Sequence, residues 1–356
     1  RHMIVHMNGG RLYSEMLEEG LKYIEDRMHG RIKSFKTPWA GFNQAGVGGL
    51  EWGSLLTLGA RPGSGKTLVV SQILRESRIH NPDQDFNILE FQFEMGGKQA
   101  ASRAFAAETA LDYNVVLSTN RSLDQFSFDL MKKHATDFRS LERQGTMRVV
   151  LNKPLTHLEI KKTIYHYYDE LGKITRQGSK PMIITIDHSW LIKKMADEKE
   201  KIATLYNTVE MLMELKNDLP IIVIMITQLN RSMEEPSRKT PGTIANYPTS
   251  SDIFGGDALM QGSDMVIALS RPAKADINIF GPKGYMVKNE DIFAHLLKVR
   301  NGADDKNLLF MKAEFSKQRM IEVSEPVASN PNGNGYVRFS QQRRGQQSDG
   351  PDISNI

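Results

Sequence analysis

Continuous apolar segments of strand length alternate with helical segments through most of this 356-residue chain. The apolar segments are rich in β-branched residues, and the segments between them carry apolar residues at helical spacing. Strands without a polar face must be covered on both sides, as in a mostly parallel central sheet flanked by helices. The expected strands span 54–58, 87–93, 147–151, 182–186, 221–226 and 265–269, and the expected helices span 67–77, 98–110, 157–171 and 202–217. The sequence therefore predicts an α/β fold.

The remaining parts of the chain have a different character. The segments 293–299 and 307–314 flank Asn301-Gly302 and predict a late antiparallel β-hairpin. Residues 10–37 hold one amphipathic helix, which either packs on its own domain or docks on a neighbouring subunit. From 324 to 356 the apolar content is too low to offset the entropy of ordering, so we expect a disordered tail. We interpret residues 1–9 as a tag remnant and disordered start, which leaves 38–323 as the main folded domain.

Composition excludes several classes of function. The chain has no cysteine, which removes disulfides, thiolate metal sites and cysteine nucleophiles and is compatible with a reducing cytoplasm. No window of about 18 apolar residues is present, so we expect no membrane-spanning helix. The formal net charge of +4 is too small to predict a polyanionic partner by itself.

The most specific motif follows the first expected strand and opens the first expected helix. It reads Ala60-Arg61-Pro62-Gly63-Ser64-Gly65-Lys66-Thr67 and continues with Leu68. This is the setting of a phosphate-binding loop, in which glycines let backbone N–H groups face the phosphates and the helix dipole favours negative charge. We expect Lys66 to reach the β- and γ-phosphates and the Thr67 hydroxyl to bind Mg²⁺. Ala60 stands where the usual pattern has its first glycine.

Polar side chains close three of the other expected strands. Asp187 ends the strand 182–186, and an acid on a strand neighbouring the phosphate-binding loop is suited to support Mg²⁺. Glu94 ends a run that we expect to lie next to the strand of this loop, which makes it the candidate base for an attacking water. Glu90, within the same run, is its rival. Gln228 follows the strand 221–226, where its amide either detects the γ-phosphate or simply closes the strand.

These motifs, in this order, resemble those of the ATPase domain of DnaB-type replicative hexameric helicases, which has a RecA-like fold. The resemblance covers roughly residues 10–320 and includes Glu94-Met95 and the run from Gln228 to Ser232. Two weaker matches are the segment from Asp252 to Gly256 that leads to Gln261, and the segment from Lys298 to Gly302.

The resemblance implies ATP and Mg²⁺ as ligands and a role for each matching residue. Lys66 and Thr67 would bind the nucleotide and Mg²⁺, Asp187 would support Mg²⁺, Glu94 would activate water, and Gln228 would sense the γ-phosphate. Lys298 and Arg300 would act on ATP held by the neighbouring protomer. The helix within 10–37 would be a linker helix that docks on an adjacent subunit. The helical domain that usually precedes this helix in the family is not recognised here, which we attribute either to truncation or to a minimal natural form of the protein.

The resemblance also implies a homo-hexameric ring that translocates 5′ to 3′ on single-stranded DNA and unwinds forked DNA, in a bacterial or phage-infected cytoplasm. Primase or a helicase loader would be further partners. The DNA-facing loop would comprise Phe254, Gly255 and Gly256, with Gln261 beyond it. Phe254 replaces an arginine that is common there, so we expect Arg238 and Lys239 to supply basic contacts instead. The alternatives are a RecA-like or KaiC-like ATPase that does not unwind DNA, and a module that uses ATP only as a conformational switch.

Overall fold

The computed structural model describes residues 12–46, 48–120, 123–175, 179–300, 302 and 308–329. Residues 1–9 and 330–356, which we interpret as the start and most of the tail, lie outside this described part. The strands are β1 (Ser54–Ala60), β2 (Asn87–Gln92), β3 (Arg148–Leu151), β4 (Met182–Asp187), β5 (Ile221–Gln228), β6 (Met265–Ser270), β7 (Ile279–Phe280), β8 (Tyr285–Met286), β9 (Asp291–Val299), β10 (Leu308–Glu314) and β11 (Arg319–Val323).

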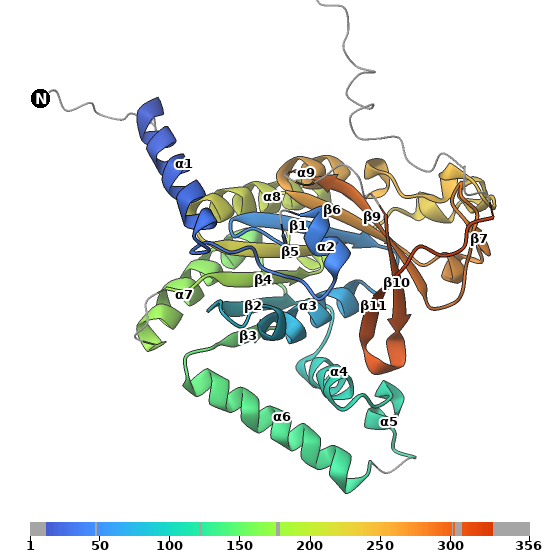
Figure 1. Cartoon of the computed structure of the whole chain (residues 1–356), viewed down its shortest axis with the longest axis horizontal. Helices are drawn as coiled ribbons and strands as arrows, with labels where there is room; N and C mark the ends of the chain where they lie inside the picture. Colours follow the sequence, from blue (N-terminus) through green and yellow to red (C-terminus); the bar gives the residue numbers. More distant parts are fainter. Residues whose placement is uncertain are drawn as a thin grey trace, which may run out of the picture.

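Nine of these strands form one mixed sheet at the centre of the molecule (Figure 1), in the order β11-β10-β9-β6-β1-β5-β4-β2-β3. The six strands from β6 to β3 in this order pair in parallel, and β9, β10 and β11 extend the sheet with antiparallel pairs. The predicted mostly parallel sheet with a late antiparallel hairpin is thus confirmed. Strand β11 was not predicted, because it is short and carries two charged residues, Arg319 and Glu322.

The predicted neighbours of β1 are wrong in two respects. We expected the strands that precede Glu94 and Asp187 to lie next to the strand of the phosphate-binding loop, but β5 separates β4 from β1, and β5 and β4 together separate β2 from β1. Consecutive strands are neighbours only about two-thirds of the time, and the chain between β1 and β2 crosses two positions that later strands fill. The parallel strands still end at one common edge, so their terminal residues can share a site.

The helices are α1 (Tyr13–Met28), α2 (Ala40–Ala45), α3 (Lys66–His80), α4 (Gly97–Thr109), α5 (Tyr113–Leu117), α6 (Gln125–Arg143), α7 (His157–Thr175), α8 (Lys201–Asp218) and α9 (Gly256–Gly262). All four helices predicted between strands are present as α3, α4, α7 and α8. The central strands are buried on both faces. In β5, Ile222, Ile224 and Ile226 belong to the core that includes α3, whereas the intervening residues belong to the core under α8.

Helix α1 extends away from the sheet (Figure 1) and buries none of its residues. Its apolar side chains lie in water, with Leu17 50%, Leu21 67%, Ile24 55% and Met28 77% exposed. At its base, Arg27 forms an ion pair with Glu51. The described structure therefore leaves the predicted apolar stripe of this helix uncovered.

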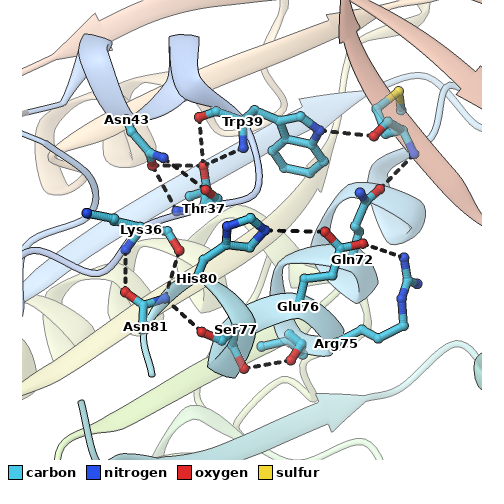
Figure 2. A network of polar contacts seen from close by, with 12 residues as sticks. Lys36, Thr37, Trp39, Asn43, Gln72, Arg75, Glu76, Ser77, His80 and Asn81 are labelled. Carbon is cyan, nitrogen blue, oxygen red and sulfur yellow. Dashed lines mark hydrogen bonds and ion pairs between the residues drawn. The ribbon is translucent and has the colours of Figure 1, made fainter. Parts of the chain in front are cut away.

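The segment after α1 is fastened to the far end of α3, as Figure 2 shows. The Asn81 side chain exchanges two hydrogen bonds with the Lys36 backbone, at 2.7 and 2.9 Å. The Trp39 indole donates to the Met320 carbonyl at 3.1 Å, and the Met320 N–H donates to Gln72 at 2.7 Å. The base of α1 is thus linked to the helix that begins at the phosphate-binding loop.

The chain beyond β11 runs beside the small sheet of β7 and β8. Ala328 forms an isolated bridge with Tyr285, and Glu325 accepts a hydrogen bond from the Tyr285 hydroxyl at 2.6 Å. Residues 324–329, which we assigned to the tail, therefore have contacts with the folded domain. No helix in the described ranges combines the length and apolarity that a membrane span requires.

Candidate active site

The predicted phosphate-binding loop joins the end of β1 to the start of α3. Gly63 and Gly65 have φ values of +74° and +91°, in the left-handed region that side chains disfavour. The loop therefore needs glycine at both positions to make its turn. The first N–H groups of α3 have no partners within the helix and carry the positive end of its dipole, which favours a bound anion at this point.

Lys66 lies at the first turn of α3 and is buried, with 9% of its surface exposed. Its ammonium group donates to the carbonyl oxygens of Ala60 and Arg61, at 2.8 and 3.3 Å. Burial lowers the pKa of Lys66 to about 8, while the negative charges of Asp187 and Glu94 act in the opposite direction. The loop thus holds a poorly solvated cation for which phosphate oxygens would be strong partners.

Thr67 and Asp187 lie together although 120 residues separate them in the sequence. The Thr67 hydroxyl donates to Oδ2 of Asp187 at 3.2 Å, and the other carboxylate oxygen, Oδ1, is buried with no hydrogen-bond partner among the described residues. Burial, together with the charge of Glu94, raises the pKa of Asp187 to about 6. A buried carboxylate oxygen without a partner, beside a hydroxyl, fits a hard cation such as Mg²⁺.

No group of three or more His, Cys, Asp or Glu residues in the described part could hold a metal ion by itself. Magnesium commonly binds through one or two protein oxygens together with phosphate oxygens and water. The pair of Thr67 and Asp187 fits that mode of binding, which depends on the nucleotide.

A cavity of about 410 Å³ opens above the phosphate-binding loop, and its lining includes Lys66, Thr67, Glu94 and Gln228. The structure therefore brings together the predicted residues from the ends of three different strands. Gln228 pairs in register with Ala60, so it lies directly beside the end of β1. Glu94 reaches the cavity from the turn after β2, with 58% of its side chain exposed and its Oε2 3.9 Å from Nε2 of the buried His188. Burial lowers the pKa of this histidine.

The rival carboxylate Glu90 has a different environment. It is 2% exposed, accepts a hydrogen bond from Nε of Arg148 at 2.5 Å and accepts another from Gln92 at 2.8 Å. It lines a separate cavity of about 300 Å³ between β2 and helices α4 and α6. The geometry thus favours Glu94 over Glu90 as the group that meets a nucleotide.

Several residues that line the cavity above the phosphate-binding loop were not predicted from the sequence. Arg271 donates to the Gly63 carbonyl at 3.1 Å and lies over the Phe315 ring at 4.2 Å, and Lys274 donates to the Pro62 carbonyl at 3.0 Å. Others in the lining are Arg103, Tyr113 and Gln318. Strand β6 lies beside β1, on the side away from β5, and Arg271 directly follows β6. Its position at the end of a strand is the sequence signal that indicates a place at this edge of the sheet.

Lys298 and Arg300 lie far from this cavity. Val299 pairs with Met265 at the start of β6, whereas Ala60 pairs with Leu269 near the end of the same strand. The two places are separated by roughly 13 Å along the strand. Arg300 is 47% exposed and pairs with Asp264 at 2.9 Å, and the Lys298 ammonium donates to the Met260 carbonyl. These cations therefore do not complete the cavity of their own chain.

The predicted DNA-facing loop, which comprises Phe254, Gly255 and Gly256, lies at the start of α9 and contacts the end of β5. The Phe254 N–H donates to the Gln228 carbonyl at 3.0 Å. Gly255 has a φ of +69°, and a Cβ there would lie 2.0 Å from Leu205; a Cβ at Gly256 would lie 2.6 Å from the Ser250 carbonyl oxygen. Both glycines are thus required by local packing. Gln261 is exposed near the end of α9.

The expected role of Arg238 as a basic contact is wrong. Its guanidinium pairs with both carboxylate oxygens of Asp252, at 2.9 and 2.8 Å, and also donates to the carbonyls of Ala245 and Tyr247. These bonds hold the segment 231–255 together and occupy the donors that a phosphate would need. Lys239 is partly exposed and lines a cavity of about 180 Å³ beside Arg61.

Comparisons with known proteins identify the family of the chain. A model of the DnaB-like helicase C terminal domain matches residues 36–319. The replicative DNA helicase DnaB of Helicobacter pylori strain J99 is 27% identical over an alignment of 353 residues, which covers 94% of this chain and 64% of the relative. DnaB of Buchnera aphidicola subsp. Baizongia pistaciae is 24% identical over 74% of this chain and 53% of its own length. The chain thus spans less than two thirds of these curated relatives.

Two solved structures share the fold. One, an ATPase domain, superposes with a TM-score of 0.68 at 15% identity, covering 86% of this chain and 99% of that one. The other, a DnaB-like replicative helicase described with its interactions with primase, superposes with a TM-score of 0.67 at 15% identity, covering 88% and 67%. The RecA-like architecture expected from the sequence motifs is therefore confirmed.

Proposed function

The chain belongs to the DnaB-like helicase C-terminal domain family, and from this premise we propose that it is the ATP-hydrolysing motor of a ring-shaped replicative DNA helicase. One observation carries the proposal. Lys66, Thr67, Glu94 and Gln228 converge on one cavity, while Lys298 and Arg300 lie too far away to act in it. The cavity of one chain therefore lacks the two cations, Lys298 and Arg300, that the resemblance assigns to ATP hydrolysis. A second copy of the chain would supply them.

Within the cavity, the triphosphate of ATP would lie over the phosphate-binding loop. The backbone N–H groups at the start of α3 and the Lys66 ammonium would bind its β- and γ-phosphates. Lys66 would exchange its present bonds to the carbonyls of Ala60 and Arg61 for phosphate oxygens. Thr67 and Asp187 would hold Mg²⁺, which when bound neutralises charge on the phosphates.

Glu94 would accept a proton from the attacking water. Its exposed carboxylate faces the cavity, and its negative charge is felt at both Lys66 and Asp187. The buried His188 beside it has a lowered pKa, so near neutral pH it is uncharged and does not neutralise Glu94. Gln228, at the end of the strand beside β1, would detect the γ-phosphate through its amide.

Lys298 and Arg300 would act on ATP bound by the adjacent protomer. The guanidinium of Arg300 is half-exposed and held by Asp264, so it can be presented to a second chain. A cation supplied in trans stabilises charge in the transition state and makes hydrolysis depend on the subunit interface. The exposed apolar stripe of α1 would dock on an adjacent protomer, which would remove Leu17, Leu21, Ile24 and Met28 from water.

The proposed partners are single-stranded and forked DNA, further copies of the chain in a hexameric ring, and a primase or helicase loader. Phe254, Gly255, Gly256 and Gln261 would lie at the DNA-facing side of each subunit. By family resemblance, the proposed direction of movement is 5′ to 3′.

Strand displacement tests this function most directly. A forked duplex with a 5′ single-stranded tail should be unwound in the presence of ATP and Mg²⁺. The Lys66→Ala variant should not unwind it, because the triphosphate loses its main side-chain cation. ATP hydrolysis without displacement, at protein concentrations that give rings, would favour an ATPase that does not unwind DNA.

A further inference from the structure

A second cavity, of about 270 Å³, adjoins the nucleotide cavity and has an unusual lining. It combines two aromatic side chains, Trp190 and Phe254, with the amides of Gln228 and Asn230 and with the guanidinium groups of Arg61 and Arg231. Gln228 also lines the nucleotide cavity, so one side chain borders both. Trp190 follows the end of β4 by three residues. Phe254 directly precedes Gly255 at the start of α9, and its N–H donates to the carbonyl of Gln228, the last residue of β5.

The two rings meet edge to face, with centroids 4.5 Å apart and planes at 87°. This geometry is favourable for an aromatic pair and fixes the position of the indole. Trp190 nevertheless keeps 45% of its surface exposed. The other two tryptophans are not available in this way, because Trp39 is 3% exposed and Trp52 packs against Phe35 and Phe86. A single exposed apolar side chain is common on protein surfaces. Trp190 differs in that it packs against a second ring and lines a cavity together with polar side chains.

The polar groups around the pair indicate which ligand it fits. Arg231 is exposed and forms no ion pair with any other described residue. Gln228 and Asn230 carry both donors and acceptors. A ligand for this cavity therefore needs a flat apolar face, polar edges and a negative charge nearby, which are together the properties of a nucleotide in a single strand.

We propose that Trp190 and Phe254 form a stacking platform for a base of single-stranded DNA, with Arg231 placed to contact an adjacent phosphate. This inference rests on the proposed function and adds to it a base contact beside the nucleotide site. Stacking does not depend on the identity of the base, because every base has a π face. The platform would therefore bind single-stranded DNA of any sequence. The stacked base would lie against Gln228, the side chain that also borders the nucleotide cavity.

The test compares binding of two oligomers of equal length to the full chain, with Mg²⁺ and a non-hydrolysable ATP analogue present. One is oligo-dT, and the other has the same backbone with abasic sites throughout. Binding is measured by anisotropy of a terminal dye, so it does not depend on tryptophan fluorescence. The variants are Trp190→Leu, which removes the large ring, Trp190→Phe, which keeps a smaller one, and Tyr206→Leu as a matched control. Tyr206 is also 45% exposed but does not line the cavity.

Stacking on one aromatic side chain predicts that Trp190→Leu raises the Kd for oligo-dT by roughly 5- to 100-fold. The same variant should bind the abasic oligomer as the unmodified chain does. Trp190→Phe should retain most of the affinity, and Tyr206→Leu should retain all of it. In addition, oligo-dT should quench the fluorescence of the unmodified chain, and the abasic oligomer should quench it much less.

If Trp190→Leu loses affinity equally for the two oligomers, or loses none for oligo-dT, the stacking platform is overturned and the helicase proposal stays intact. The platform is likewise overturned if Tyr206→Leu reproduces the effect of Trp190→Leu. If the unmodified chain binds neither oligomer, the proposed function itself fails and the platform fails with it.

Discussion

The two carboxylates that compete for the role of catalytic base can be separated by one pair of substitutions. Glu94→Gln keeps the size of the side chain and removes its charge and its basicity. Because Glu94 is 58% exposed and lies 3.9 Å from His188, the free energy of unfolding should change by less than about 0.5 kcal/mol. Loss of a general base lowers kcat by roughly 10²- to 10⁴-fold, which corresponds to about 3–5 kcal/mol in the barrier.

The same substitution should leave Mg²⁺-dependent ATP binding intact. Glu94 is one cause of the raised pKa of Asp187, so removing its charge moves that pKa downward and favours the ionised carboxylate that Mg²⁺ requires. The expected phenotype is therefore tight nucleotide binding with very slow turnover. Binding is measured with a fluorescent ATP analogue, and turnover by phosphate release at saturating ATP.

Glu90→Gln serves as the matched comparison. Glu90 is buried and accepts hydrogen bonds from Arg148 and Gln92, so its replacement leaves a partly buried guanidinium without a charged partner. The free energy of unfolding should fall by about 2–4 kcal/mol, while kcat of the folded protein stays within a few-fold. Near-normal kcat in Glu94→Gln would refute the assignment of the base, as would a stable Glu90→Gln variant that cannot hydrolyse ATP.

Three further perturbations test other parts of the account. Gly255→Ala should lower the free energy of unfolding by about 2–4 kcal/mol, because φ is left-handed there and the new Cβ would lie 2.0 Å from Leu205. In urea titrations, the Gly255→Ala/Leu205→Ala double variant should lose less stability than the two single variants together, and additive losses would refute the packing explanation. Burial lowers the pKa of His295 to about 3, so the unfolded chain binds more protons below about pH 6.5 and stability falls as pH falls. Urea unfolding at pH 7 and pH 5 should show a loss of about 2 kcal/mol that His295→Leu lacks, and an equal loss in both proteins would contradict this. Arg300→Ala subunits mixed with unmodified ones should lower ATP turnover below the linear average, whereas a strictly linear decline would argue against action in trans.

Much of the fold follows from patterns that local physics explains. Strands such as β4 and β5 are apolar at nearly every position because both faces are covered, and the glycines of the loop at 60–67 mark its turn. The order of strands does not follow in this way. Nothing between β1 and β2 indicates that the crossing skips two positions, because those positions are filled by strands that come later in the chain.

The candidate site shows the same division. Lys66 and Thr67 were predicted from the phosphate-binding loop motif, and Asp187, Glu94 and Gln228 were predicted because a residue at the end of a parallel strand reaches the shared edge of the sheet. Their convergence on one cavity or one hydrogen-bonded pair agrees with that reasoning.

Residues whose partners are distant in sequence were missed or misjudged. Arg238 was expected to contact DNA because it is a basic residue in a polar segment. Its guanidinium instead donates to Asp252 and to two carbonyl groups. Trp190 carries no sequence signal of its own, since its significance depends on the ring of Phe254, which lies far along the chain. Such pairs are set by tertiary packing, which the sequence pattern alone does not specify.

The central claim is that ATP hydrolysis, the subunit interface and DNA contact form one coupled system. The most direct measurement is the rate of ATP hydrolysis with and without single-stranded DNA, at protein concentrations that allow rings to form. We predict strong stimulation by the strand, lost in Lys66→Ala and reduced in Trp190→Leu. Steady hydrolysis that is indifferent to DNA would preserve the nucleotide site and contradict the motor.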